Sequence, residues 1–189
     1  MGRISKNASF VLTMFVLVFL FGTASGSDVR TAETTYGVKA GFIMPGTWYV
    51  GDYEYDADMN WSIGGFVDYK LGPKIVGTGK LDIHGFGAYE ESGMLFDIGF
   101  MMRALVYSET SNLTFRPGFG ISYGALGSMG PYDGTSYLML TGTVEIVFSS
   151  QKNFSWMGEF GLVGAVDGGN DDFTATFGPG LIIRGGMLF

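Results

Sequence analysis

Residues 94–107 read MLFDIGFMMRALVY, and this stretch decides the fold class. Apolar side chains stand at every second position from Met94 to Val106. The positions between them include two charges, Asp97 and Arg103. Alternation with a period of two places successive side chains on opposite faces of a β-strand. We therefore predict a strand that meets apolar surroundings on one face and polar surroundings on the other.

The same alternation recurs along the chain and predicts eight strands. They span residues 36–45, 61–71, 80–90, 94–107, 113–126, 137–149, 156–167 and 173–189. The connections between consecutive strands are short, which favours antiparallel neighbours. A chain that is mostly strand is unusual for an ordinary globular domain and natural for a barrel.

The two faces of these strands indicate lipid rather than water outside the barrel. One face carries large aliphatic and aromatic side chains, and the other is rich in glycine with isolated charges. Glycine suits a narrow interior, whereas large apolar residues suit a surface in lipid. Aromatic residues that lie near strand ends, as in membrane barrels, are Trp61, Tyr69, Tyr89 and Trp156. We predict an all-β, eight-stranded antiparallel up-and-down transmembrane β-barrel. A soluble lipocalin-like barrel with its apolar face inside is the alternative.

Composition excludes several other classes of protein. The 189 residues include 32 glycines, 16% aromatic residues and 15% charged residues, with a net charge of −7. A disordered chain would be poorer in aromatic residues and richer in charge. The chain has no cysteine and one histidine, which excludes disulfides, thiolate metal sites, a cysteine nucleophile and paired-histidine metal sites. We expect no cofactor and no metal.

The first 26 residues resemble a secretory signal peptide. Arg3 and Lys6 form a basic start, an apolar run follows over residues 10–21, and small residues close it at 22–26. The apolar run is shorter than the ~20 residues that a spanning helix needs. We predict that residues 1–26 are removed, by cleavage after Ala24 or Gly26, and that residues 27–189 form the barrel domain. An uncleaved anchor helix is the alternative.

The connections carry charge asymmetrically. With the mature N-terminus in the periplasm, the outer loops are residues 46–60, 91–93, 127–136 and 168–172, and the inner turns are 72–79, 108–112 and 150–155. The outer loops contain no lysine or arginine; their acidic residues are Asp52, Glu54, Asp56, Asp58, Glu91, Asp133, Asp171 and Asp172. The basic residues outside the strands, Arg30, Lys74 and Lys152, all fall on the inner side. We predict that both termini are periplasmic.

The signal segment, the eight glycine-rich strands and the C-terminal phenylalanine together resemble the small outer-membrane β-barrel family, which includes OmpA-like and OmpX-like barrels. Residues 64–69 (GGFVDY) and 116–120 (RPGFG) look like the second and fifth strands of that family. The last strand, residues 181–189 (LIIRGGMLF), resembles the terminal signal that the assembly machinery reads, with Met187 and Phe189 as the matching residues. Its glycines, at 185 and 186, are displaced from the position usual in the family.

The resemblance implies a protein of the bacterial outer membrane. Its implied partners are membrane lipid and lipopolysaccharide, periplasmic chaperones and the barrel-assembly machinery. No basic patch indicates a nucleic-acid partner. Fold specifies activity poorly, because function lies in sites. We predict a non-enzymatic barrel with a structural or envelope-interaction role, and a lipid A-modifying barrel enzyme of the acylase or deacylase type is the alternative.

Six basic and six acidic side chains are predicted to point into the lumen. They are Lys39, Lys70, Lys80, Arg103, Arg116 and Arg184, and Asp68, Asp82, Glu90, Asp97, Glu145 and Glu159. Uncompensated charge in a narrow interior is costly, so we expect these groups to pair. The turn lengths place Asp82 opposite Arg103. They also align a belt of four residues, joined by Lys39 across the closing seam: Arg116, Glu145, Glu159 and Arg184. We predict a barrel plugged by side chains rather than an open porin.

Few residues could carry chemistry. His84 is the only histidine and is predicted to point into the lumen, with Ser122 as the lumen serine on a comparable face. A nucleophilic site needs a nucleophile, a base and an orienting group within reach of one another, and we interpret His84 as structural. Residues 56–60 (DADMN) resemble the start of a calcium loop, but Trp61 stands where the pattern requires glycine. Binding of a divalent cation by the acidic outer loops is left open.

Overall fold

The computed structural model describes residues 33–88, 91–107, 112–127, 129, 132, 134–149 and 154–189. The expected signal segment, residues 1–26, lies outside the described residues, as do Tyr89, Glu90 and Asp133. Within the described ranges, no helix is long and apolar enough to cross a membrane.

Eight long strands form the wall of the molecule. They are β1 (Thr34–Met44), β4 (Asn60–Gly72), β5 (Ile75–Ala88), β6 (Glu91–Ala104), β8 (Leu113–Gly127), β9 (Ser136–Ser149), β10 (Ser155–Gly169) and β11 (Ala175–Leu188). Three short strands add to this wall: β2 (Thr47–Val50), β3 (Tyr53–Asp56) and β7 (Val106–Tyr107). Each long strand overlaps a segment of period-two alternation. This alternation gives a strand two faces of different polarity, so that one face can meet the interior and the other the outside.

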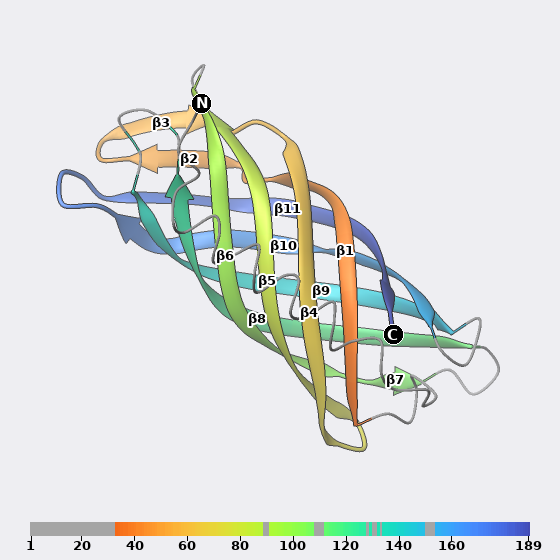
Figure 1. Cartoon of the computed structure of the whole chain (residues 1–189). Coiled ribbons are helices and arrows are strands. Elements are labelled where there is room, and N and C mark those ends of the chain that lie inside the picture. Colours follow the sequence, from red (N-terminus) through yellow and green to blue (C-terminus); the bar gives the residue numbers. More distant parts are fainter. Residues whose placement is uncertain are drawn as a thin grey trace, which may run out of the picture.

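The long strands close into a barrel. Each pairs antiparallel with the next one along the chain, and β1 also pairs with β11 (Figure 1). The predicted eight-stranded antiparallel up-and-down barrel is confirmed. Closure pairs both edges of every long strand, so none of the eight presents the open edge that would invite aggregation.

The wall is apolar outside and polar inside. Large apolar side chains are exposed at alternate positions along six of the long strands, β5 and β11 each expose one (Ile75 and Ile183), and Phe119 on β8 is 72% exposed. Ten charged side chains of these strands are buried in the lumen. A water-soluble barrel buries its apolar face, because burial of apolar surface drives folding in water. The lipocalin-like alternative is therefore wrong in its assignment of the two faces.

The segment predicted as an outer loop over residues 46–60 is largely a β-hairpin. β2 pairs with β3 through a two-residue turn, and three residues of β2 pair with β11, beginning at Val50↔Ala175. Gly51 in this turn has a φ of 57°, a left-handed conformation that glycine adopts without steric cost. The hairpin prolongs the wall of the barrel at one end, which Figure 1 shows at the upper left.

The interior has three parts. At the hairpin end, fourteen buried residues form an apolar cluster that includes Trp48, Phe86 and Phe177. Buried charged side chains fill the middle. A smaller apolar cluster lies nearer the end where β1 begins and β11 ends, and it consists of Phe66, Val147, Met157 and Leu188.

Phe177 departs from the predicted alternation. The sequence pattern places it on the outer face with Leu181 and Ile183, but its side chain is 3% exposed and belongs to the apolar cluster at the hairpin end. The register between β10 and β11 shifts between Val163 and Ala165, opposite the stretch that contains Gly178, whose φ is 104°. A β-bulge reverses the faces of the residues beyond it.

Candidate functional site

Ten charged side chains fill the middle of the lumen, and we call them the lumen charge network. The five cations are Lys39, Lys80, Arg103, Arg116 and Arg184, and the five anions are Asp68, Asp82, Asp97, Glu145 and Glu159. All ten residues are at most 5% exposed. Equal numbers of the two signs leave the network neutral, and a buried network requires such compensation because unpaired charge in a low-dielectric interior is costly.

The register of the strands aligns a belt of charges across β8 to β11. Arg116 stands opposite Glu145, Glu145 opposite Glu159, and Glu159 opposite Arg184. The Arg116 Nε lies 3.3 Å from Glu145, and the Arg184 Nε donates to Glu159 at 2.6 Å. Lys39 on β1 donates to Glu159 at 3.3 Å across the closing seam. The structure thus places these five predicted residues together.

Glu145 and Glu159 are adjacent carboxylates that would repel each other if left alone. Arg103 of β6 reaches both, with its Nη2 2.7 Å from Glu145 and 3.6 Å from Glu159. β6 is a neighbour of neither β9 nor β10, so this guanidinium crosses the lumen. A cation between two carboxylates offsets their mutual repulsion.

Two further ion pairs join strands that are not neighbours. Arg116 of β8 donates to Asp68 of β4. Arg184 of β11 lies 2.9 Å from Asp82 of β5. Together with Arg103, these pairs occupy the cross-section of the lumen, because each spans from one part of the wall to another.

The predicted pairing of Asp82 with Arg103 is wrong. Asp82 stands opposite Asp97, and Arg103 stands opposite Val76. Pairing of β5 with β6 begins at Ala88↔Glu91, so β5 ends two residues earlier and β6 begins three residues earlier than the sequence pattern predicts, which shifts the register. The two facing carboxylates are bridged by Lys80, whose Nζ lies 3.1 Å from Asp82 and 2.5 Å from Asp97.

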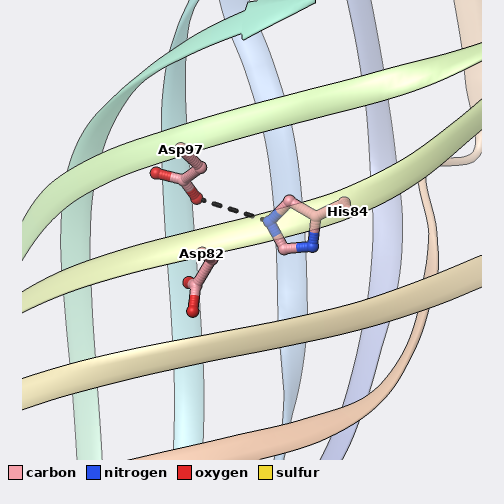
Figure 2. Close-up of side chains that lie close together, drawn as sticks. All are labelled: Asp82, His84 and Asp97. Atoms are coloured by element: carbon pink, nitrogen blue, oxygen red, sulfur yellow. Dashed lines mark ion pairs between the residues drawn. The ribbon is translucent and has the colours of Figure 1, made fainter. Parts of the chain in front are cut away.

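Asp82, His84 and Asp97 form the one group of side chains in the described residues whose spacing could hold a metal ion (Figure 2). Their potential ligand atoms lie within 4.8 Å of one another, and all three residues are buried. Carboxylate and imidazole donors suit a transition metal or zinc. The Lys80 ammonium already binds both carboxylates, so a cation of the protein itself balances the charge that a metal ion would otherwise balance.

Ser62, rather than the predicted Ser122, is the serine beside the only histidine. The Oγ of Ser62 lies 2.9 Å from His84 Nδ1, and His84 Nε2 lies 3.6 Å from Asp97. Ser122 Oγ has no hydrogen-bond partner among the residues that the structure describes. The pairing of β4 with β5 sets Ser62 opposite His84. The sequence analysis predicted a longer turn at residues 72–79, and that turn gives a different register in which the two residues do not face each other.

Ser62, His84 and Asp97 are arranged like the nucleophile, the base and the orienting carboxylate of a catalytic triad. Ser62 and His84 are each 2% exposed, and the Arg184 guanidinium donates to the Ser62 hydroxyl at 3.3 Å. A nucleophile must approach a substrate carbonyl. These two side chains are enclosed by the wall and by the network instead.

Trp48 is the central residue of the apolar cluster at the hairpin end, and the sequence analysis did not single it out. Its side chain is fully buried and its Nε1 donates to the Tyr137 hydroxyl at 3.0 Å. Its ring packs edge-on against Phe86 and Tyr132 at centroid distances of 5.5 and 4.8 Å. The signal was present as two short alternating runs, TWYV and YEYD, around a Gly-Asp turn.

The remaining predicted residues lie at the two ends of the barrel. Phe189 donates from its N–H to the Tyr36 carbonyl at 2.8 Å and accepts from the Tyr36 N–H at 3.2 Å, so it extends the closing seam. Met187 stands on the same seam opposite Val38. Lys70 is half-buried near the opposite end from the hairpin. The exposed acidic residues around the hairpin are Asp52, Glu54, Asp56 and Asp58.

Comparison with known proteins supports the fold and goes no further. No protein-family model matches the chain, and no curated protein matches it. The solved structure of the outer membrane protein OprG from Pseudomonas aeruginosa is similar, with a TM-score of 0.53, 10% identity, and coverage of 86% of this chain and 99% of that chain. The structure of Ail, the attachment invasion locus protein of Yersinia pestis, in complex with the heparin analogue sucrose octasulfate, has a TM-score of 0.46, 13% identity, and coverage of 84% and 100%.

Proposed function

We propose that the chain is an integral β-barrel protein of the bacterial outer membrane, without enzymatic activity, whose lumen is plugged by its own side chains. The observation that carries this proposal is the polarity of the wall. Apolar side chains face outward on all eight long strands, while ten charges are buried inside. Such a surface is unfavourable in water and is the surface that a transmembrane barrel needs.

Aromatic side chains support the membrane location. Trp61 and Tyr123 are exposed towards the hairpin end, and Tyr69, Tyr107 and Trp156 are exposed towards the other end. Tryptophan and tyrosine favour the boundary between lipid and water at both surfaces of a membrane. With residues 1–26 as a signal peptide, the termini lie on the periplasmic side and the hairpin end faces outward. Lipid and lipopolysaccharide then surround the wall.

The same proposal includes assembly through the last strand. Met187 and Phe189 form the signal that the barrel-assembly machinery reads after periplasmic chaperones deliver the chain. Phe189 also pairs with Tyr36 at the seam, so the residues that carry the signal lie where the first and last strands of the barrel meet.

Two features support a closed lumen. The cross-lumen ion pairs fill the middle, and the apolar cluster around Trp48 fills the hairpin end. An interior of eight strands is just wide enough for side chains to fill. We infer a structural or envelope-interaction role, because a plugged barrel transports little and displays its hairpin and acidic loops.

A lipid A-modifying enzyme is the second candidate, favoured only by the contact between Ser62 and His84. Lipid A mass spectra from cells with and without the gene separate the two. An unchanged acyl pattern supports the non-enzymatic role. If lipid A loses or gains an acyl chain when the gene carries Ser62→Ala in place of the parent sequence, the protein is the enzyme.

Conductance tests the plugged lumen. Purified protein in a planar bilayer should show no stable, wide channel, and the protein should migrate differently on a gel before and after boiling, as a detergent-stable barrel does. A stable porin-sized conductance would contradict the plug. A water-soluble protein without a heat-dependent shift would contradict the membrane barrel itself.

A further inference from the structure

The outer wall carries a groove between β6 and β8, on the side away from the hairpin. Its volume is about 560 Å³, and it opens towards the outside of the barrel. Its lining is apolar apart from Arg103, whose side chain points into the lumen, and consists of Ile75, Met102, Ala104, Pro117, Gly118 and Phe119.

The groove lies where the backbone pairing with β8 is interrupted. β6 pairs with β8 as far as Arg103↔Gly118, and pairing resumes only at Val106↔Phe115 in β7. Pro117 lies in the interval and has no N–H to donate to the ladder. Leu105 turns away and donates its N–H to the carbonyl of Lys74 at 2.8 Å.

Ala104 is a small, exposed residue in this interval, and Gly118 lines the groove with its backbone, because a Cβ there would meet the Arg103 side chain on the lumen side. Ile75 and Phe119 stand on either side with about half or more of their surface exposed. An apolar groove between side chains on a lipid-facing wall suits an acyl chain, because dispersion contacts form where apolar groups pack closely.

One exposed cation is the immediate sequence neighbour of a residue that lines this groove. Lys74 is exposed in the turn between β4 and β5, next to Ile75 in sequence and hydrogen-bonded through its carbonyl to Leu105. Among the described residues, no ion pair involves Lys74, whereas five other basic residues are paired inside the lumen. An ammonium at the membrane boundary attracts a phosphate.

We propose that this groove is a binding site for one anionic glycerophospholipid of the periplasmic leaflet, with an acyl chain along Ala104 and Gly118 and the headgroup phosphate at Lys74. The proposal rests on the proposed membrane location. Phosphatidylglycerol should be preferred to phosphatidylethanolamine, because the zwitterionic headgroup brings its own ammonium to the site.

Native mass spectrometry of the detergent-solubilised full chain, incubated with equal amounts of phosphatidylglycerol and phosphatidylethanolamine, tests the site. We expect one retained phosphatidylglycerol per barrel. Ala104→Phe should fill the groove and reduce that adduct at least fivefold. Ala40→Phe, the same substitution on an exposed alanine of β1, should leave it unchanged.

The headgroup contact has its own variant. Lys74→Gln should leave a lipid bound but bring the two lipids to equal occupancy. Equal adducts in the parent chain and in Ala104→Phe, no adduct in any variant, or a preference that survives Lys74→Gln would each overturn the site. A heat-dependent gel shift and insertion into vesicles, measured on the same samples, show whether the barrel itself has formed, so failure of the lipid site and failure of the membrane location remain distinguishable.

Discussion

Glu159 contacts three cations in the lumen, Lys39, Arg103 and Arg184. Its carboxylate therefore connects β10 to β1 and β11, the two strands that form the closing seam, and to β6 across the lumen. Removing one member of a buried charge network leaves the other charges uncompensated. The resulting loss of folding stability exceeds the net stabilisation that the original pairs provide.

Glu159→Gln removes the charge while keeping the shape of the side chain. We expect it to lower the free energy of unfolding by about 3–5 kcal/mol, measured by urea titration in vesicles. Glu54→Gln on the exposed hairpin is the matched control and should change it by less than about 0.5 kcal/mol. Equal effects of the two substitutions would show that the lumen charges are not buried as a network.

Phe100 tests the outer face in the same way. It is exposed in the middle of β6. Phe100→Arg should cost about 2–4 kcal/mol, because an arginine at the centre of the lipid is poorly solvated. Phe100→Leu should be tolerated. The measurement is reversible unfolding from vesicles, and comparable stabilities of the two variants would mean that this face does not meet lipid.

At the scale of elements, the β2–β3 hairpin is held to the barrel by three residue pairs with β11 and by the insertion of Trp48. Short strands alone provide little stability, so the buried indole carries most of the attachment.

Trp48→Ala should cost about 3–5 kcal/mol, since it leaves a cavity beneath the hairpin. The hairpin should also become sensitive to protease while the rest of the barrel stays protected. Tyr49→Ala removes an exposed ring from the opposite face of the same strand and should change neither property. A protease-resistant hairpin in Trp48→Ala would show that the strand pairing alone holds it.

The last strand has two separable roles. Deleting Phe189 should lower the yield of barrel in the outer membrane, through loss of the assembly signal, while refolding of the purified chain from urea into vesicles should change little. Phe189→Ala retains the two backbone hydrogen bonds to Tyr36 and should still lower the yield. An unchanged cellular yield in both variants would count against the signal.

At the scale of the whole molecule, the sequence predicted what depends on alternation and missed what depends on connections. Each run of alternating residues reports its own two faces, so the wall and the burial of residues such as Lys39 and Arg184 could be predicted locally. The partner of Asp82 could not, because a register is set by where the turn falls, and β5 ends and β6 begins earlier in the chain than their apolar pattern indicates.

The hairpin end was missed for a related reason. Trp48 lies in a strand of four residues, too short for a periodic pattern to stand out, and its acidic neighbours suggested a solvated loop. Phe177 was placed on the wrong face because a bulge interrupts the alternation. Both residues belong to the apolar cluster at the hairpin end, where the sequence shows no sustained alternation.

The three tryptophans offer the most direct test of the central claim that lipid surrounds the outer wall and side chains fill the lumen. Trp61 and Trp156 are exposed on the wall, whereas Trp48 is buried within the barrel. Three variants, each retaining one tryptophan and carrying phenylalanine at the other two positions, would be reconstituted in vesicles of lipids brominated on their acyl chains. Bromine quenches fluorescence at contact, so Trp61 and Trp156 should be quenched and Trp48 should keep its emission. Quenching of Trp48 to the same extent as the other two, or the absence of quenching at Trp61 and Trp156, would contradict the account.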